Sequence, residues 1–302
     1  MTINELKKLL VEFEENLEFK QSLKKKNWFN IGGKAKVFYK ANNLNSLLKF
    51  LKKLDNNERL FIIGAGSNTL ITDDLYDGVI IKLGKNFNNI SLHGDNVVIA
   101  GSAVLDKTLS EFAMNNNISG FEFLSCIPGT IGGGIRMNAG CFEREFKDIL
   151  ISVQAIDKIG NVVTIPAKDI KFDYRKNDLS ENLIFLSASF KGVLGNKGEI
   201  YNEVQRLKIK KEKNQPSKIK TSGSTFKNPI LQTNKKVWEL IKESVPLDTR
   251  FGDAYISEKH CNFFVNNGNA SFKDMKNLIE FVSKKVLDKT GINLEKEIKI
   301  LE

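Results

Sequence analysis

Two polar motifs in the second half of the chain are suited to binding an anion or moving a proton. Arg175 ends the string FDYR, and a guanidinium group can bind a carboxylate or a phosphate through two hydrogen bonds. Glu295 and Glu297 alternate in the string LEKEI, so their side chains would point to the same face of a strand. Taken alone, these strings are more typical of a surface arginine and of solvent-exposed glutamates.

Two further strings contain possible nucleophiles or acids. Ser224 and Lys227 lie three residues apart in GSTFKNP, which is the SxxK spacing of penicillin-binding proteins and β-lactamases. That class also needs companion motifs such as SDN, which the sequence lacks, so acyl transfer is not supported. His260 precedes Cys261 in SEKHCN, but two adjacent ligands do not make a zinc site. A structural histidine remains the alternative to a functional one.

Two glycine-rich strings could hold phosphate groups. In residues 61–70, FIIGAGSNTL, a strand feeds a tight turn, but the third glycine and the helix of a dinucleotide-binding fingerprint are missing. In residues 127–140, IPGTIGGGIRMNAG, five glycines would let backbone N–H groups approach a ligand closely. The alternatives are an ordinary connecting turn and a flexible surface loop. The candidate cofactor-binding residues are Gly64, Ala65, Gly66, Ser67, Asn68, Gly129, Thr130, Gly132, Gly133, Asn138 and Gly140.

The composition narrows the class of protein. The chain has 302 residues, of which 41% are hydrophobic and 27% charged, as in globular proteins. The net charge of +10 indicates either a field that attracts anionic ligands or a general lysine bias. The lysines are dispersed and no basic stripe is interleaved with aromatic residues, so nucleic-acid binding is not supported.

The cysteines, the histidines and the hydropathy pattern indicate in which cellular compartment the protein works. The three cysteines are far apart in sequence and there are two histidines, so we expect no disulfide framework and no metal site. No apolar run approaches the roughly 18 residues of a membrane span, and Met1–Phe19 reads as an amphipathic helix rather than a signal peptide. The sequence therefore predicts a cytoplasmic protein without membrane insertion.

The elements that would position these motifs follow from hydrophobic periodicity. We expect helices at Leu44–Leu54, from an Asp106 cap through Asn116, and from a Ser271–Asp274 capping box to Gly291. The Gly-rich stretch Pro128–Gly140 is expected to be a loop. Strands are expected at Lys36–Tyr39, Arg59–Ile63, Gly78–Leu83, Asn96–Ala100, Val153–Ile156, Val162–Ile165, Ile184–Phe190, Phe263–Val265 and Glu297–Leu301.

This pattern predicts an α+β fold in three segments. Residues 1–85 and 86–207 each mix short strands with a helix. The Lys-rich stretch Lys208–Lys220, which contains Pro216, reads as a linker. It opens the third segment, residues 208–302.

The order of the motifs resembles one enzyme family along essentially the whole chain. IGG at Ile31–Gly33, GAGSNTLI, IPGTIGGGIRMNAG, FDYRKND, SGSTFKNP, SEKHCNFFVN and GINLEKEI are together similar to the UDP-N-acetylenolpyruvoylglucosamine reductases (MurB), in the shorter, type II-like subclass. The resemblance implies that residues 1–85 and 86–207 are two subdomains of an FAD-binding fold of the vanillyl-alcohol-oxidase type. It also implies that residues 208–302 form a substrate-binding domain with the catalytic serine and glutamate.

The resemblance further implies a reaction and its participants. NADPH would reduce non-covalently bound FAD, and the flavin would reduce UDP-N-acetylglucosamine enolpyruvate to UDP-N-acetylmuramate for peptidoglycan. Arg175 and Glu297 match the groups that stabilise the enediolate, and Ser224 matches the acid that protonates carbon. Tyr174, Lys227, Asn228 and His260 match substrate-binding positions.

Two departures and two alternatives accompany the resemblance. Arg136 stands where we expect a small apolar residue, and the stretch Pro246–Asp253 lacks the family's glycine-rich loop. Another flavin oxidoreductase of the same fold would explain the glycine strings but not GSTFKNP with Arg175 and Glu297. A non-catalytic nucleotide-binding protein would explain the strings and the charge alone. A flavin spectrum and reoxidation by the enolpyruvyl substrate separate the three hypotheses.

Overall fold

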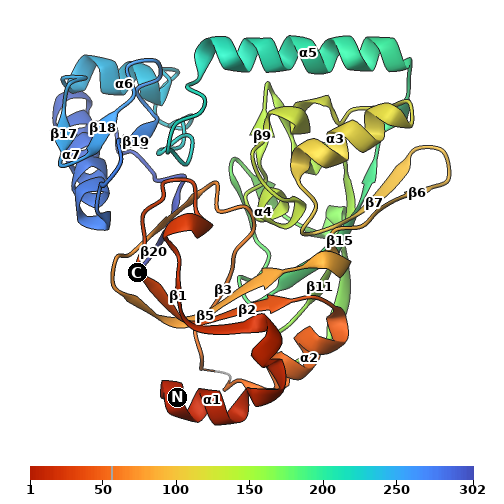
Figure 1. Ribbon diagram of the computed structural model, residues 1–302. Helices are drawn as coiled ribbons and strands as arrows, with labels where there is room; N and C mark the ends of the chain where they lie inside the picture. The colour runs from red at the N-terminus through yellow and green to blue at the C-terminus, as the bar shows by residue number, and fades with distance from the viewer. Residues whose placement is uncertain (56) are drawn as a thin grey trace. The chain divides into compact units, whose positions relative to one another are not determined.

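The strand predicted at Lys36–Tyr39 is part of a four-stranded sheet in the computed structural model, which describes residues 1–55 and 57–302. The strand order is β1-β2-β5-β3, with β3 parallel to β5 (Figure 1). Tyr39 stacks on Phe50 of the helix α2 with ring centroids 3.9 Å apart, and Phe13 packs edge-on against both rings. The bounds are β1 Leu17–Ser22, β2 Lys34–Ala41, α2 Leu44–Lys53, β3 Leu60–Ile62 and β5 Leu75–Leu83.

A second sheet of five strands follows in the chain. Its order is β12-β11-β15-β7-β6, and each neighbouring pair is antiparallel. The helix α4 packs against β15 and β7 (Figure 1). The apolar side chains of α3 and α4 share a core with this sheet. The bounds are β6 Ile90–His93, β7 Val97–Gly101, α3 Asp106–Asn115, α4 Ile131–Arg136, β11 Leu150–Ile156, β12 Val162–Pro166 and β15 Ile184–Lys191.

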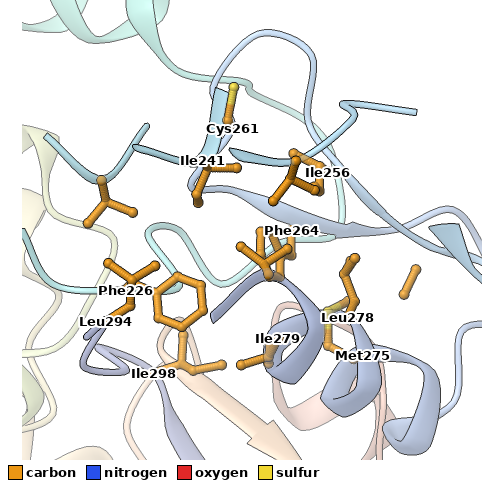
Figure 2. Close-up of a cluster of buried hydrophobic side chains, with 14 of the residues drawn as sticks. Phe226, Ile241, Ile256, Cys261, Phe264, Met275, Leu278, Ile279, Leu294 and Ile298 are labelled. Atoms are coloured by element: carbon orange, nitrogen blue, oxygen red, sulfur yellow. The ribbon is translucent and has the colours of Figure 1, made fainter. Parts of the chain in front are cut away.

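The C-terminal residues build a third core from helices and short strands. The strands β17, β18 and β19 form an antiparallel sheet, and β20 pairs in parallel with β4. Figure 2 shows Phe226 of this core close to Leu294 and Ile298, with Phe264 to its right. The centroids of the Phe226 and Phe264 rings are 5.9 Å apart. The bounds are β4 Thr69–Ile71, α6 Val237–Ser244, β17 Arg250–Phe251, β18 Ala254–Ile256, β19 Phe264–Asn266, α7 Phe272–Thr290 and β20 Lys299–Leu301.

These cores divide into two compact units that are discontinuous in sequence. Unit 1 contains residues 1–19, 36–65 and 77–211, and unit 2 contains residues 20–35, 66–76 and 212–302. The first glycine string is therefore split, because Gly64 and Ala65 belong to unit 1 and Gly66 to unit 2. Within residues 1–55 and 57–302, no helix combines the length and apolar character that a membrane crossing requires.

The N-terminal prediction of one long helix is wrong. The helix α1, Ile3–Leu9, ends at Leu10, and a 3₁₀ helix, Val11–Asn16, leads into β1. Three glutamates follow Leu10 within five residues, where a continuing helix would gain like charges near its negative C-terminal end. The apolar stripe was nevertheless read correctly, since Leu6, Leu10, Phe13 and Leu17 are all buried.

Residues 208–214 are helical rather than part of a linker. They complete α5, Lys197–Asn214, which buries Ile200, Val204 and Leu207 at helical spacing. Lysine and glutamate are good helix formers, so a Lys-rich stretch with this spacing continues the helix until Pro216 prevents it.

Asp106 does not cap α3. Leu105 occupies the cap position without a side-chain hydrogen bond, and its backbone forms an isolated bridge with Thr130. That bridge fixes the start of the helix, so the Asp106 carboxyl turns inward and is fully buried.

Candidate active site

The two predicted glycine strings meet in unit 1. A methyl group built on Gly64 would overlap the hydroxyl of Thr130, so the backbone of the first turn lies directly against the second string. Only glycine allows this approach. The rest of the first turn, residues 65–68, includes Gly66, whose φ of +67° favours glycine and whose Cα hydrogens face the Lys26 carbonyl.

The second string is not the loop that its glycines predict, because residues 131–136 form α4. Each glycine in a helix interior costs about 1 kcal/mol relative to alanine, so the packing must favour small residues here. At Gly134 the reason is visible, since a side chain would overlap the ring of Phe146. At Gly132 a methyl group would lie 3.1 Å from Ser102 Cβ. Gly133 is exposed, Gly129 partly buried and Thr130 buried.

This region fits a nucleotide cofactor by its chemistry. Backbone at Gly64, Gly129 and Gly132 is bare of side chains, and the Ser102 hydroxyl beside Gly132 is buried without a hydrogen-bond partner. A buried hydroxyl without a partner normally finds one in water or a ligand. These groups could therefore hold the phosphates or ring of a bound dinucleotide.

Arg175 is oriented by the end of the second string. It lies in the turn between β13, Phe172–Asp173, and β14, Lys176–Asn177, with a φ of +57°. Its Nη2 donates to the Gly140 carbonyl at 2.9 Å, and its Nη1 donates to Glu145 Oε1 at 3.3 Å.

Asn138 connects the same groups from inside. Its Nδ2 donates to Glu145 Oε2 at 3.0 Å and to the Asp173 carbonyl at 3.1 Å. Its Oδ1 accepts from the Lys147 N–H at 3.1 Å, and the side chain is fully buried. Asn138 thus ties the string to the hairpin that carries Arg175. No sequence pattern marked Glu145, which aligns the guanidinium.

Arg136, whose role was open, stabilises a neighbouring loop. Its guanidinium donates to the carbonyls of Leu179, Ser180 and Leu183 at 2.8–3.0 Å. It also lies over the Phe185 ring, 4.2 Å from the centroid. These contacts give Arg136 a structural role in unit 1.

In unit 2 the structure brings Ser224 and Glu297 onto adjacent backbone segments. The Glu297 N–H donates to the carbonyl of Thr225 at 2.8 Å, and the Lys227 N–H donates to the carbonyl of Glu295 at 2.8 Å. Ser224 itself forms a bridge with Phe263 on its other side. Ser224 and Glu297 are both partly exposed.

Asn262 fixes this arrangement and was missed by the sequence analysis. Its Oδ1 accepts from the Phe226 N–H at 3.0 Å, and its Nδ2 donates to the Phe226 carbonyl at 2.8 Å. Its own carbonyl accepts from the Thr225 N–H at 2.8 Å. An asparagine beside a His–Cys pair carries no pattern that would have revealed this.

The first glycine string also contacts the Glu297 segment. Asn68 Nδ2 donates to the Glu297 carbonyl at 3.0 Å, and the Lys299 N–H donates to the carbonyl of Asn68 at 3.0 Å. Asn68 and the partly exposed Ser67 lie in unit 2 beside β4. The prediction that no helix follows this string is confirmed, since β4 starts at Thr69.

His260 lies beside the serine segment. Its ring packs edge-on against Phe263 at 4.7 Å, and its Nδ1 is buried without a partner. Burial lowers the pKa of His260, so the imidazole is neutral at pH 7. A neutral ring with a buried nitrogen can donate or accept one hydrogen bond.

The other predicted substrate residues have protein partners of their own. Lys227 pairs with Glu295 at 2.5 Å, and Asn228 Oδ1 accepts from the Val237 N–H at the start of α6. The Arg175 guanidinium lies over the ring of Tyr174, with Cζ 4.9 Å from the ring centroid.

Known proteins resemble the chain over its full length. Residues 35–166 match the family model "FAD binding domain", and residues 215–301 match "UDP-N-acetylenolpyruvoylglucosamine reductase, C-terminal domain". A UDP-N-acetylenolpyruvoylglucosamine reductase of Pelagibacter ubique (strain HTCC1062) is 65% identical over 302 residues, which is 100% of both chains. One from Rickettsia typhi (strain ATCC VR-144 / Wilmington) is 45% identical over 280 residues, 92% of this chain and 93% of the relative.

A solved structure agrees with these sequences. The crystal structure of UDP-N-acetylenolpyruvylglucosamine reductase (MurB) from Thermus caldophilus matches with a TM-score of 0.80 at 28% identity, over 95% of this chain and 98% of that one. The predicted α+β fold with an FAD-binding domain is confirmed. The chain belongs to the UDP-N-acetylenolpyruvoylglucosamine reductase (MurB) family.

Proposed function

We propose that this chain reduces UDP-N-acetylglucosamine enolpyruvate to UDP-N-acetylmuramate, with FAD as its cofactor and NADPH as the electron donor. The observation that carries the proposal is the pairing of residues 225–227, which directly follow Ser224, with residues 295–297, which include Glu297. The full-length identity of 65% to a reductase of that name supports the same reaction.

Arg175 and Glu297 are proposed to stabilise charge on the substrate. Hydride addition to an enolpyruvyl ether moves negative charge onto the carboxylate as an enediolate, which needs a fixed cation and a hydrogen-bonding acid. Glu145 and the Gly140 carbonyl hold the Arg175 guanidinium in one orientation. A guanidinium held in this way loses little freedom when it binds a carboxylate.

Ser224 is proposed to deliver the proton to carbon. A serine hydroxyl is a weak acid, so its proton must be replaced by a neighbour once it has been given up. The backbone around Ser224 is fixed by the Phe263 bridge and by Asn262. Among the predicted substrate-region residues, the neutral His260 beside Phe263 supplies a further hydrogen-bonding group to this segment.

The glycine strings are proposed to hold the cofactor. When bound there, FAD would supply the hydride chemistry that links NADPH oxidation to reduction of the enolpyruvyl carbon. Gly64, Gly129, Gly132 and the Ser102 hydroxyl would contact the dinucleotide, and Asn138 would keep the string attached to the Arg175 hairpin.

The three-segment division is proposed as the functional one. Residues 1–85 and 86–207 would contribute the FAD-binding subdomains, and residues 208–302 the substrate-binding domain. All three cysteines carry free thiols, as is usual in a reducing compartment such as the cytoplasm, where we place the enzyme.

The substrate test separates this function from other flavin chemistry. The purified protein is reduced anaerobically with NADPH and mixed with UDP-N-acetylglucosamine enolpyruvate. We expect the oxidised flavin spectrum to return and UDP-N-acetylmuramate to form. UDP-N-acetylglucosamine without the enolpyruvyl group is the control and should leave the flavin reduced. Equal reoxidation by both compounds, or by neither, contradicts the proposal.

A further inference from the structure

Two cysteines that are distant in sequence are neighbours in unit 1. Cys126 ends a 3₁₀ helix, Glu122–Cys126, and Cys141 ends the short strand β9, Gly140–Cys141, which packs against that helix. Their side chains are hydrogen-bonded to each other. The two residues flank the glycine string 127–140, and no CxxC pattern marks them.

The surroundings make the two thiols unequal. The hydrogen bond from Cys141 lowers the pKa of Cys126 to about 6, against the effect of burial. The Ser125 hydroxyl, 3.7 Å from the Cys126 sulfur, and the ammonium groups of Lys211 and Lys208 act in the same direction. The same hydrogen bond, together with burial, raises the pKa of Cys141. Cys126 is therefore the more acidic of the two thiols and the one that forms a thiolate first as pH rises.

A thiolate beside a second thiol is the arrangement of a redox-active dithiol. The thiolate is the form that attacks peroxides, and a neighbouring thiol can resolve the product. Cys126 is 4% exposed, so a small oxidant has access where a large one does not, while Cys141 is partly exposed. Lys211 Nζ also donates to the Cys126 carbonyl at 2.6 Å and holds positive charge near the sulfur.

We propose that Cys126 and Cys141 form a modification site for hydroperoxides, at which hydrogen peroxide closes a reversible disulfide across the glycine string. The Cys126 thiolate attacks one peroxide oxygen, which gives a sulfenic acid and a hydroxide that takes up a proton to become water. The Cys141 thiol then attacks the Cys126 sulfur, and the sulfenic oxygen leaves as a second water. Two thiols are oxidised and one peroxide is reduced to two waters.

The disulfide acts on the catalytic cation through Gly140. The carbonyl of Gly140 accepts from Arg175 Nη2 at 2.9 Å, and Cys141 follows in the same short strand. Drawing Cys141 into a covalent bond moves this carbonyl and with it the guanidinium. Given the role proposed for Arg175, oxidation should slow flavin reoxidation by the enolpyruvyl substrate by up to about 10²-fold, the cost of a displacement of about an ångström.

The chemical part of the proposal is tested on the holoenzyme without any activity assay. The protein is treated with hydrogen peroxide, its remaining thiols are alkylated, and the peptides are mapped by mass spectrometry before and after dithiothreitol. We expect an intramolecular Cys126–Cys141 linkage that dithiothreitol reverses, with Cys261 left as a thiol. The same linkage should form in Cys261→Ser and be absent from Cys126→Ser and Cys141→Ser. Irreversible oxidation of Cys126 in the wild type, or no linkage at all, overturns the site.

The functional part has a separate readout. The rate of flavin reoxidation is compared for the reduced, oxidised and dithiothreitol-recovered wild type, with Cys141→Ser treated in parallel. We expect slowing and recovery in the wild type, and no such reversible change in Cys141→Ser. A disulfide that forms and leaves the rate unchanged overturns the link to Arg175. A protein that forms the disulfide but never reacts with the enolpyruvyl substrate contradicts the proposed function instead.

Discussion

Glu295 and Glu297 share a strand-like segment but have different surroundings. Glu295 has a side chain that is 72% exposed and pairs with Lys227, whereas Glu297 is partly buried and its backbone is bonded to Thr225 and Asn68. Backbone anchoring on both sides fixes the position of Glu297, which is what a group that meets a developing charge requires. The difference makes the two glutamates a matched pair for an experiment.

Substitution of Glu297 should affect the chemistry and substitution of Glu295 should not. We expect Glu297→Gln to slow flavin reoxidation by the enolpyruvyl substrate by about 10²-fold or more, as when one group stabilising an oxyanion is removed. Affinity for the UDP-sugar should change far less, because the interaction is strongest in the transition state. Stopped-flow absorbance measures the rate of reoxidation. Titration of the oxidised enzyme with the UDP-sugar measures the affinity. If Glu295→Gln is the slow variant, the wrong glutamate has been assigned.

The site residues predicted from the sequence lie in recognisable local strings, whereas the residues that the prediction missed act through partners distant in sequence. Ser224 and Glu297 lie in strings that can be matched to a family, and the structure places them on adjacent backbone. Glu145 and Asn262 act only through partners distant in sequence, Arg175 and Phe226. Such positioning roles depend on the fold, so no spacing in the sequence could have predicted them.

At the scale of elements, the start of α3 buries a carboxyl group, at a cost in stability, beside the glycine string proposed to bind the cofactor. Both oxygens of Asp106 are buried without partners, and one lies 2.6 Å from where a methyl group on Gly129 would be. Burial raises the pKa of Asp106 well above its usual range. The carboxyl group is therefore protonated in the folded protein at pH values where it is ionised in the unfolded chain.

The pH dependence of stability should change in Asp106→Asn. The unfolded Asp106 loses its proton above about pH 4, whereas the folded one keeps it, so wild-type stability falls as pH rises. The variant, which has no proton to lose, should gain relative to the wild type above about pH 4, by at most about 1.4 kcal/mol per pH unit. Urea unfolding at several pH values from 4 to 8 measures the difference, and a constant difference contradicts the buried neutral carboxyl.

The element that carries Ser224 should depend on Asn262. Asn262→Ala leaves the buried N–H and carbonyl of Phe226 without partners, at about 1–3 kcal/mol for each group. We expect the free energy of unfolding of the C-terminal core to fall by about 2–6 kcal/mol. Asn267→Ala, at an exposed site, is the control and should be close to neutral. Equal stability of the two variants would show that the hydrogen bonds from the Asn262 side chain to Phe226 contribute nothing to the free energy of unfolding.

Most elements followed from periodicity, and the exceptions have physical causes. The capping box at Ser271 and the left-handed Gly291 bound α7 as predicted, because both signals are local. The glycines of α4 predicted a loop, but contact with Phe146 requires small residues in a helix. The N-terminal helix ends at Leu10, where three glutamates would add like charges near its negative end, a local signal that the apolar stripe alone does not show. Tertiary packing decided the case of α4, and it is not visible in a local window.

For the whole molecule, we expect a yellow protein that holds FAD without a covalent bond. Neither glycine string contains a histidine that could tether the ring, and the two thiols that flank the second string, Cys126 and Cys141, are engaged with each other. Acid precipitation should release all flavin into the supernatant, measured by its absorbance. Flavin that stays with the precipitate would contradict non-covalent binding, and mapping of the labelled peptide would identify the attachment.

The central claim is that Ser224 serves one of two steps that share a flavin. Its hydroxyl is assigned only to carbon protonation, and reduction of the flavin by NADPH needs no proton from it. Ser222 is a poor control, because it is buried and its hydroxyl donates to the Thr69 carbonyl at 3.4 Å. Ser217 is exposed and lies in the same unit, so Ser217→Ala is the matched control.

Stopped-flow measurement of the two half-reactions in Ser224→Ala tests this claim most directly. We expect bleaching of the flavin by NADPH at nearly the wild-type rate and reoxidation by the enolpyruvyl substrate slowed by about 10² to 10⁴, the usual weight of general acid catalysis. Ser217→Ala should match the wild type in both. Reoxidation at the wild-type rate in Ser224→Ala, or equal slowing of both half-reactions, would contradict the role of Ser224 as the acid that protonates carbon.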